Sequence, residues 1–210
     1  GKRRKSKKSH QAMGKEMKVL CVIGSPRKGN THRVCEDLAA KVREYNPSVS
    51  FDYLMLQDAH VEMCRGCQVC LLRGVEKCPL KDDIPTIVDR LNRAEGYILA
   101  SPGYNQQVPG LMKNFIDRMS FNCHSPSLYG KRALTITTVG GMGAKPTLNY
   151  LTLIATCWGG HVVGSLSVLM DYVNHVPGHK EKAQKRIARM ARSYAAALNS
   201  TDKPVPNFRD

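Results

Sequence analysis

An unbroken apolar run that ends in a glycine-bounded loop is the feature that most constrains the fold of this chain. The run covers residues 18–23, and the loop Gly24–Thr31 follows it at once. A short apolar run without alternation is typical of a strand buried on both faces, as in a parallel sheet. The segment after the loop predicts a helix, because apolar residues recur there at near-helical spacing. These residues are Val34, Leu38, Val42 and Tyr45.

The same alternation of strand and helix continues along the chain. Five strands alternating with five helices predict an α/β fold with a doubly wound five-stranded parallel sheet and helices on both faces. We expect this domain to cover residues 17–200, between a disordered basic tail at residues 1–16 and a short C-terminal tail at residues 201–210. The later strands are predicted at residues 49–56, 97–100, 133–139 and 162–169.

The glycine loop predicts a site for one phosphate group. Its two glycines have the spacing of a nucleotide-binding P-loop, but Asn30-Thr31 stands where that loop has Lys-Ser/Thr. The loop also lacks the Gly-x-Gly-x-x-Gly pattern of dinucleotide sites. A terminal phosphate can still be held by backbone N–H groups and by the helix start. The predicted ligands are Ser25, Arg27, Gly29, Asn30 and Thr31, and the alternative is a plain turn capped by Thr31.

Two further loops follow strands at the same predicted edge of the sheet, where ligands of doubly wound folds bind. The loop after residue 100 offers an aromatic ring and amides, in Ser101, Pro102, Gly103, Tyr104 and Asn105. The loop after the next strand offers a hydroxyl and glycines that allow close approach to a flat ligand, in Thr138, Gly140 and Gly141. A phosphate loop, an aromatic loop and a glycine loop together indicate flavin mononucleotide (FMN).

Four of the eight cysteines are crowded into the loop at residues 60–80. Cys64, Cys67 and Cys70 are spaced by three residues, and Cys78 is followed by proline, as in bacterial ferredoxins. This spacing predicts ligands for an iron–sulfur cluster, most simply [4Fe–4S]. A loop without metal, a zinc site or a disulfide are the alternatives. The scattered cysteines, including Cys21 and Cys123, are predicted to belong to the core.

These motifs, taken in order, resemble the flavodoxin-like NADPH-dependent FMN reductases, specifically their iron–sulfur flavoprotein branch. The matching segments are Gly24–Thr31, Cys64–Cys78, Asp82-Asp83, Ser101–Tyr104 and Lys113–Arg118. The resemblance implies a flavodoxin-like fold, bound FMN, and a homodimer or homotetramer with FMN near an interface. Gly103 departs from the family, which usually has a β-branched residue there, and Asn105–Gln107 replaces small or aromatic residues.

The charge of the chain is strongly positive, with 32 Lys and Arg against 17 Asp and Glu. The basic tail carries no interleaved aromatic residues, so nucleic-acid binding is not favoured. The basic last helix, at residues 179–199, can attract an acidic electron-transfer partner. No apolar stretch approaches the ~20 residues that span a bilayer, and no secretion signal precedes the first strand. We therefore expect a cytoplasmic protein with no membrane partner.

The function predicted from these features is that of an FMN-binding oxidoreductase with a cysteine-ligated cluster. Such a protein passes electrons between flavin, cluster and a redox partner, and NAD(P)H is a candidate reductant. The first alternative is an NAD(P)H-dependent FMN or quinone reductase whose cysteine loop holds no cluster. A more distant alternative is a non-catalytic protein that binds nucleic acid through its basic termini. The sequence shows no isolated candidate for a general acid or base.

Overall fold

The computed structural model describes residues 16–170 and 178–202 of the chain. Most of the predicted basic tail and residues 203–210 of the predicted C-terminal tail lie outside the described residues. The strands are β1 (Met17–Ile23), β2 (Val49–Met55), β3 (Gly96–Pro102), β4 (Arg132–Val139) and β5 (His161–Leu169). The helices are α1 (Asn30–Tyr45), α2 (Val69–Leu72), α3 (Ile84–Arg93), α4 (Gly110–Arg118), α5 (Ala144–Cys157) and α6 (His179–Asn199). Three 3₁₀ turns complete the fold: η1 (Leu56–Asp58), η2 (Val75–Lys77) and η3 (Ser120–Cys123).

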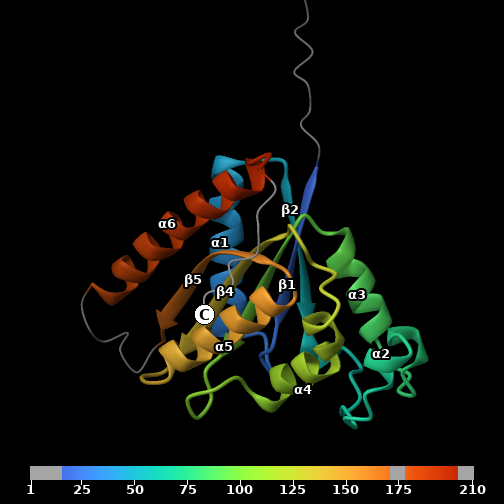
Figure 1. Cartoon of the computed structure of the whole chain (residues 1–210). Coiled ribbons are helices and arrows are strands. Elements are labelled where there is room, and N and C mark those ends of the chain that lie inside the picture. Colours follow the sequence, from blue (N-terminus) through green and yellow to red (C-terminus); the bar gives the residue numbers. More distant parts are fainter. Residues whose placement is uncertain (1–15, 171–177, 203–210) are drawn as a thin grey trace, which may run out of the picture.

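The five strands form one parallel sheet in the order β2-β1-β3-β4-β5. Figure 1 shows this sheet lying among the helices. The predicted flavodoxin-like α/β sheet is therefore confirmed. The chain passes from β1 outward to β2 and then returns across β1 to β3. Loops diverge at such a reversal, and they leave a crevice beyond the carboxyl ends of the strands. The loops after β1, β3 and β4 all leave this edge.

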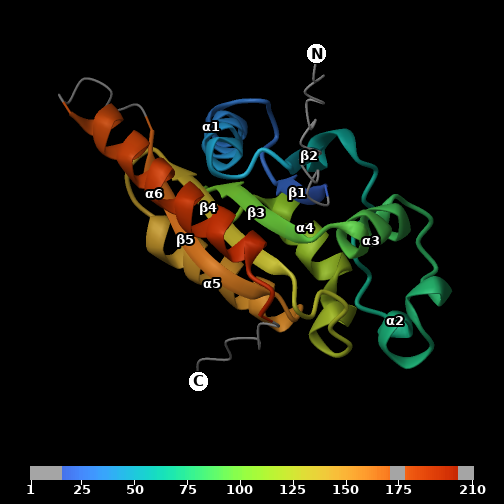
Figure 2. The same ribbon diagram turned by 90° about the horizontal axis from the view of Figure 1, so that it is seen from above.

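Two apolar cores lie on opposite faces of the sheet, and Figure 2 shows the helices that cover each face. Helices α1 and α6 cover one face, where Leu38 and Ile187 pack against strand residues such as Cys21. Helices α3, α4 and α5 cover the other face, where Phe115 meets Trp158 edge-on at 5.9 Å between ring centroids. Cys21 is fully buried, in agreement with the prediction that it is a small core residue.

Cys123 differs from the sequence-based expectation: it was predicted to belong to the core, but it lies exposed at the end of η3. Helix α5 is only partly covered, because Leu151 is buried while Leu148 and Ile154 remain half-exposed. No helix in the described part of the chain is both long and apolar enough to cross a bilayer.

Candidate functional site

The loop between β1 and α1 is held in a tight turn. The Ser25 hydroxyl donates to the carbonyl of Arg27 at 2.8 Å and accepts the Arg27 N–H at 3.4 Å. Gly24 is required where the turn begins, because a Cβ atom there would lie 2.5 Å from Cβ of Met112 on α4. The glycine therefore allows the loop to rest directly on α4.

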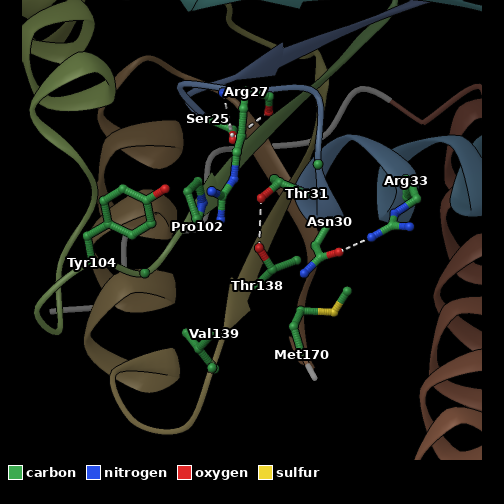
Figure 3. Close-up of a pocket in the computed structure, with 13 residues that line it drawn as sticks. Ser25, Arg27, Asn30, Thr31, Arg33, Pro102, Tyr104, Thr138, Val139 and Met170 are labelled. Carbon is green, nitrogen blue, oxygen red and sulfur yellow. Dashed lines mark hydrogen bonds between the residues drawn. The ribbon is translucent and has the colours of Figure 1, made fainter. Parts of the chain in front are cut away.

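The start of α1 is suited to an anion. Its first N–H groups receive no capping side chain, and its first turn contains no acidic residue. The Thr31 hydroxyl lies 2.7 Å from the Thr138 hydroxyl, and both residues are buried. This contact joins the start of α1 to the end of β4. In Figure 3 the Arg27 side chain reaches into the space between Tyr104 and Thr31.

The loop after β3 forms a small hairpin. The backbone groups of Tyr104 and Gln107 bond to each other at 2.8 and 3.0 Å, and Asn105 and Gln106 between them have φ values of 46° and 67°. Two successive positive φ angles are typical of a type I′ turn. Gly103 donates its N–H to the Thr138 carbonyl at 2.8 Å. The hairpin is thus fastened to the end of β4.

Gly103 marks a close approach between two loops. A Cβ atom at this position would lie 2.7 Å from Cγ1 of Val139, which is closer than real Cβ contacts allow. Val139 thus fills the space that a side chain at position 103 would need.

These loops enclose a cavity of about 530 Å³ (Figure 3). The described residues that line it include two arginines and no acidic residue, so the cavity favours anions. Ten predicted site residues line it: Ser25, Arg27, Gly29, Asn30, Thr31, Pro102, Gly103, Tyr104, Thr138 and Gly140. The chain thus brings together the three loops that the sequence had linked only by their places after strands.

Three predicted residues lie outside the cavity lining. Ser101 is fully buried, and its hydroxyl donates to the Pro102 carbonyl at 3.0 Å. Asn105 is exposed at the hairpin tip, and Gly141 is exposed in open space. The cavity is also lined by three residues that the sequence did not predict: Arg33, Val139 and Met170. Arg33 lies in the first turn of α1, directly after the glycine loop. A cation at that position could have been predicted to line the site from the sequence.

The four clustered cysteines line a second, smaller cavity of about 60 Å³. Cys67 is exposed, and the other three are half-buried. The pKa of the Cys70 thiol is raised by burial first, and then by the negative charge that Cys78, Cys64 and Cys67 carry when ionised. Within residues 16–170 and 178–202, no group of three or more His, Cys, Asp or Glu residues is arranged around a single metal ion.

Helix α4 contacts both ends of the cysteine loop. The Asn114 carboxamide accepts the N–H of Cys64 at 3.2 Å and donates to the Val61 carbonyl at 3.0 Å. One turn later, Arg118 donates from Nη1 to Sγ of Cys78 at 3.2 Å. Its Nη2 bonds both carboxylate oxygens of Asp82, at 2.9 and 2.8 Å.

The ion pair between Arg118 and Asp82 is buried, with side-chain exposures of 5% and 0%. The Asp82 carboxylate also accepts the N–H groups of Glu62 at 2.9 Å and Ile84 at 3.2 Å. The Asp82 carboxylate thus binds donors from three segments of the chain, at Glu62, Ile84 and Arg118. Asp82 thus accepts the first N–H of α3, that of Ile84, whereas the side chain of Asp83 accepts the N–H of His60.

Comparison with known proteins assigns the chain to a family. The model of the NADPH-dependent FMN reductases matches residues 17–175. An iron–sulfur flavoprotein of Archaeoglobus fulgidus is 30% identical over 92% of this chain and 86% of its own length. A quinone reductase of Escherichia coli is 28% identical over 62% of this chain and 64% of its own length.

A solved structure agrees with this fold. An NADH:FMN oxidoreductase in its apo form superposes with a TM-score of 0.66 and 21% identity, over 92% of this chain and 97% of that one. The family model thus matches most of the chain, and the similar proteins include iron–sulfur flavoproteins. The chain is an FMN-dependent oxidoreductase that belongs to the NADPH-dependent FMN reductase family, in its iron–sulfur flavoprotein branch.

Proposed function

We propose that this protein passes electrons between FMN in the larger cavity and a cysteine-ligated iron–sulfur cluster in the smaller one. The observation that carries the proposal is that all four clustered cysteines line one cavity. Four thiolates are the usual ligand set of a [4Fe–4S] cluster. FMN exchanges two electrons as hydride or one electron at a time, so it can connect a two-electron donor such as NAD(P)H with a one-electron centre.

The larger cavity fits the phosphate of FMN. Unbonded N–H groups at the start of α1, the Ser25 turn and the Arg27 side chain all favour a dianion there. Asn30 and Thr31 add polar side chains at the same end. Tyr104 and Gly103 would then border the ring system on one side, and the backbone at Gly140 would border it on another. We do not assign Ser101, Asn105 or Gly141 to the cofactor, because they do not line the cavity.

The donor set of the smaller cavity suits a cluster, because its lining offers four thiols. The cysteines are free thiols rather than disulfides. The Arg118 N–H aimed at Cys78 would offset part of the negative charge that four thiolates bring. Cys64, Cys67, Cys70 and Cys78 would act as ligands and not as nucleophiles.

An absorption spectrum of protein purified without oxygen, with iron and acid-labile sulfide assays on the same sample, tests this proposal. We expect flavin bands with a broad shoulder near ~400 nm and about four irons per chain. Cys70→Ser should lose the iron and keep the flavin. Cys123→Ser is the matched control, because it removes a thiol outside the cavity, and it should keep both. Flavin without iron in the unaltered protein would contradict the cluster.

The second candidate is an NAD(P)H-dependent FMN or quinone reductase without a cluster. It is favoured by the similarity to the quinone reductase and by Tyr104, which is 44% exposed at the cavity mouth, where an acceptor can approach. This candidate predicts that Cys70→Ser keeps full NAD(P)H–quinone reductase activity. The cluster proposal predicts that the same variant keeps flavin reduction and loses one-electron transfer to an external protein.

We further propose a homodimer or homotetramer that works in the reducing environment of the cytoplasm. Met142, just before α5, and Leu153, within α5, are 83% and 59% exposed, which supports coverage of these apolar side chains by a second copy. An acidic electron-transfer partner is supported by α6, whose solvent face is basic. Its exposed cations are Lys180, Lys182, Lys185, Arg186, Arg189 and Arg192. Light scattering gives the oligomer size, and the salt dependence of reduction of an acidic ferredoxin tests the partner.

A further inference from the structure

From the contacts of α4 we infer that Arg118 is a positioning residue that hydrogen-bonds the Cys78 ligand sulfur and thereby raises the reduction potential of the cluster. The inference rests on the proposed cluster and deepens it. Its basis is that one guanidinium contacts two groups. Nε and Nη2 donate to the Asp82 carboxylate, and Nη1 donates to Sγ of Cys78 at 3.2 Å. Only arginine presents donors in such a rigid fork.

The surroundings of Arg118 fix its orientation. The Asp82 carboxylate that holds it is fully buried and is itself held by the N–H groups of Glu62 and Ile84. Arg118 is on α4, so its backbone is fixed by the helix that packs under the sheet. A donor with so little freedom keeps its N–H on the sulfur in both oxidation states. The cysteine loop supplies the ligand, and α4 supplies the donor.

The bond acts on the potential through charge. One-electron reduction adds a negative charge to a centre whose ligands are already anionic, and an N–H donor at a ligand sulfur stabilises that charge. Because the positive charge of Arg118 is balanced by Asp82, the effect comes from the directed N–H and not from a net local charge. Removal of the donor should make reduction about tenfold less favourable, which corresponds to about 59 mV for one electron.

Asn114 secures the other end of the same loop. It accepts the N–H of Cys64 and donates to the carbonyls of Val61 and Glu62, at 3.0 and 3.3 Å. Asn114 and Arg118 are four residues apart, so they share one face of α4. The first and last thiols of the loop are thus placed by one helix. Asn114→Asp removes both donors, and it should speed the loss of iron to a chelator severalfold.

The test is a redox titration followed by electron paramagnetic resonance on anaerobic protein. A reduced viologen dye supplies the single electron and is itself oxidised by one electron, and no bond forms or breaks. Arg118→Lys keeps a cation beside Asp82, but one ammonium cannot bond both Asp82 and Cys78 as the fork does. Arg90→Lys is the matched control, since Arg90 forms an arginine–aspartate pair with Asp52 at 2.7 Å, away from the cysteines.

The expected result is a midpoint about 59 mV lower in Arg118→Lys and unchanged in Arg90→Lys, with equal iron content. An unchanged midpoint in Arg118→Lys at full iron content overturns the inference and leaves the cluster standing. Absence of iron in the unaltered protein overturns the cluster and the inference together. If Arg118→Lys does not fold, the double variant Asp82→Asn with Arg118→Gln, which replaces the buried ion pair by two amides, is titrated in its place. The same lowering of the midpoint supports the inference, and an unchanged midpoint overturns it.

Discussion

The side-chain hydroxyls of Thr31 and Thr138 lie 2.7 Å apart in a buried contact between the start of α1 and the end of β4. The two residues belong to different elements, and both line the larger cavity. This end of the cavity is therefore held in shape before any ligand binds. Such preorganisation lowers the free-energy cost of binding.

Thr31→Val tests this contact. The substitution removes one hydroxyl at nearly constant volume and leaves the buried Thr138 hydroxyl without its partner, so we expect FMN affinity to fall about tenfold. Fluorescence titration of the apoprotein with FMN measures the change. Thr152→Val is the control, because Thr152 makes a similar hydroxyl contact with Ser165 at 3.0 Å outside the cavity. Equal losses in both variants would contradict a role of Thr31 at the cofactor.

Arg27→Ala tests the charge of the cavity. A charge-assisted bond to phosphate contributes about 1.5–3 kcal/mol, so FMN affinity should fall by one to two orders of magnitude. Riboflavin lacks the phosphate, and its affinity should not change. Arg43→Ala serves as the control, because Arg43 lies in the last turn of α1, over the ring of Phe51. A parallel loss of riboflavin affinity would place Arg27 at the ring instead.

Gly103→Val tests the packing reason for the glycine. The new Cβ would meet Val139 at 2.7 Å, so the variant should lose about 1–3 kcal/mol of unfolding free energy. The double variant Gly103→Val with Val139→Ala should recover part of this loss, because it frees the space. Denaturant unfolding measures both proteins. Additive losses in the double variant would show that Val139 is not the obstacle.

Cys123 should react slowly with alkylating reagents although it is exposed. Burial of its sulfur and the negative charge of a neighbouring ionised Cys157 raise the pKa of Cys123 to about 11. At pH 8 only about one Cys123 thiol in a thousand is then ionised, and the thiolate is the nucleophile.

Peptide mass spectrometry after timed iodoacetamide treatment follows this thiol separately from the others. The rate at Cys123 should still rise above pH 10, whereas the rate of an ordinary thiol, with a pKa near ~8.5, levels off above about pH 9.5. Cys157→Ser should move the Cys123 profile to lower pH. A plateau at Cys123 below pH 9 in the unaltered protein would refute the raised pKa.

The sheet and the larger cavity were predictable because their signals are local. An apolar run followed by glycine, as at Ile23-Gly24, indicates both a buried strand and the residue at which the strand ends. Val139 and Met170 were missed because their proximity depends on the pairing of β4 with β5, where the Met170 N–H bonds the Val139 carbonyl at 2.7 Å. No short-range pattern encodes that register.

The exposure of Cys123 and the contacts of Arg118 were unpredictable for a similar reason. Cys123 follows an apolar helix, and its neighbour Phe121 is buried, so composition alone favoured the core. Arg118 reads as an ordinary helix-ending cation until Asp82, 36 residues earlier, is placed beside it. Buried polar contacts between distant segments follow from the tertiary fold, and one sequence does not reveal them.

Helix α4 has a consequence for how such a protein can change over time. Met112 lies under Gly24 of the glycine loop, and Arg118 reaches Cys78. The two positions are six residues apart, so they are separated by a fixed helical rise of about 9 Å. The cysteine loop is anchored to this helix at its two ends. Its middle can therefore be lengthened, shortened or stripped of thiols while the flavin cavity keeps its support, which makes the loop an exchangeable module on a constant reductase frame.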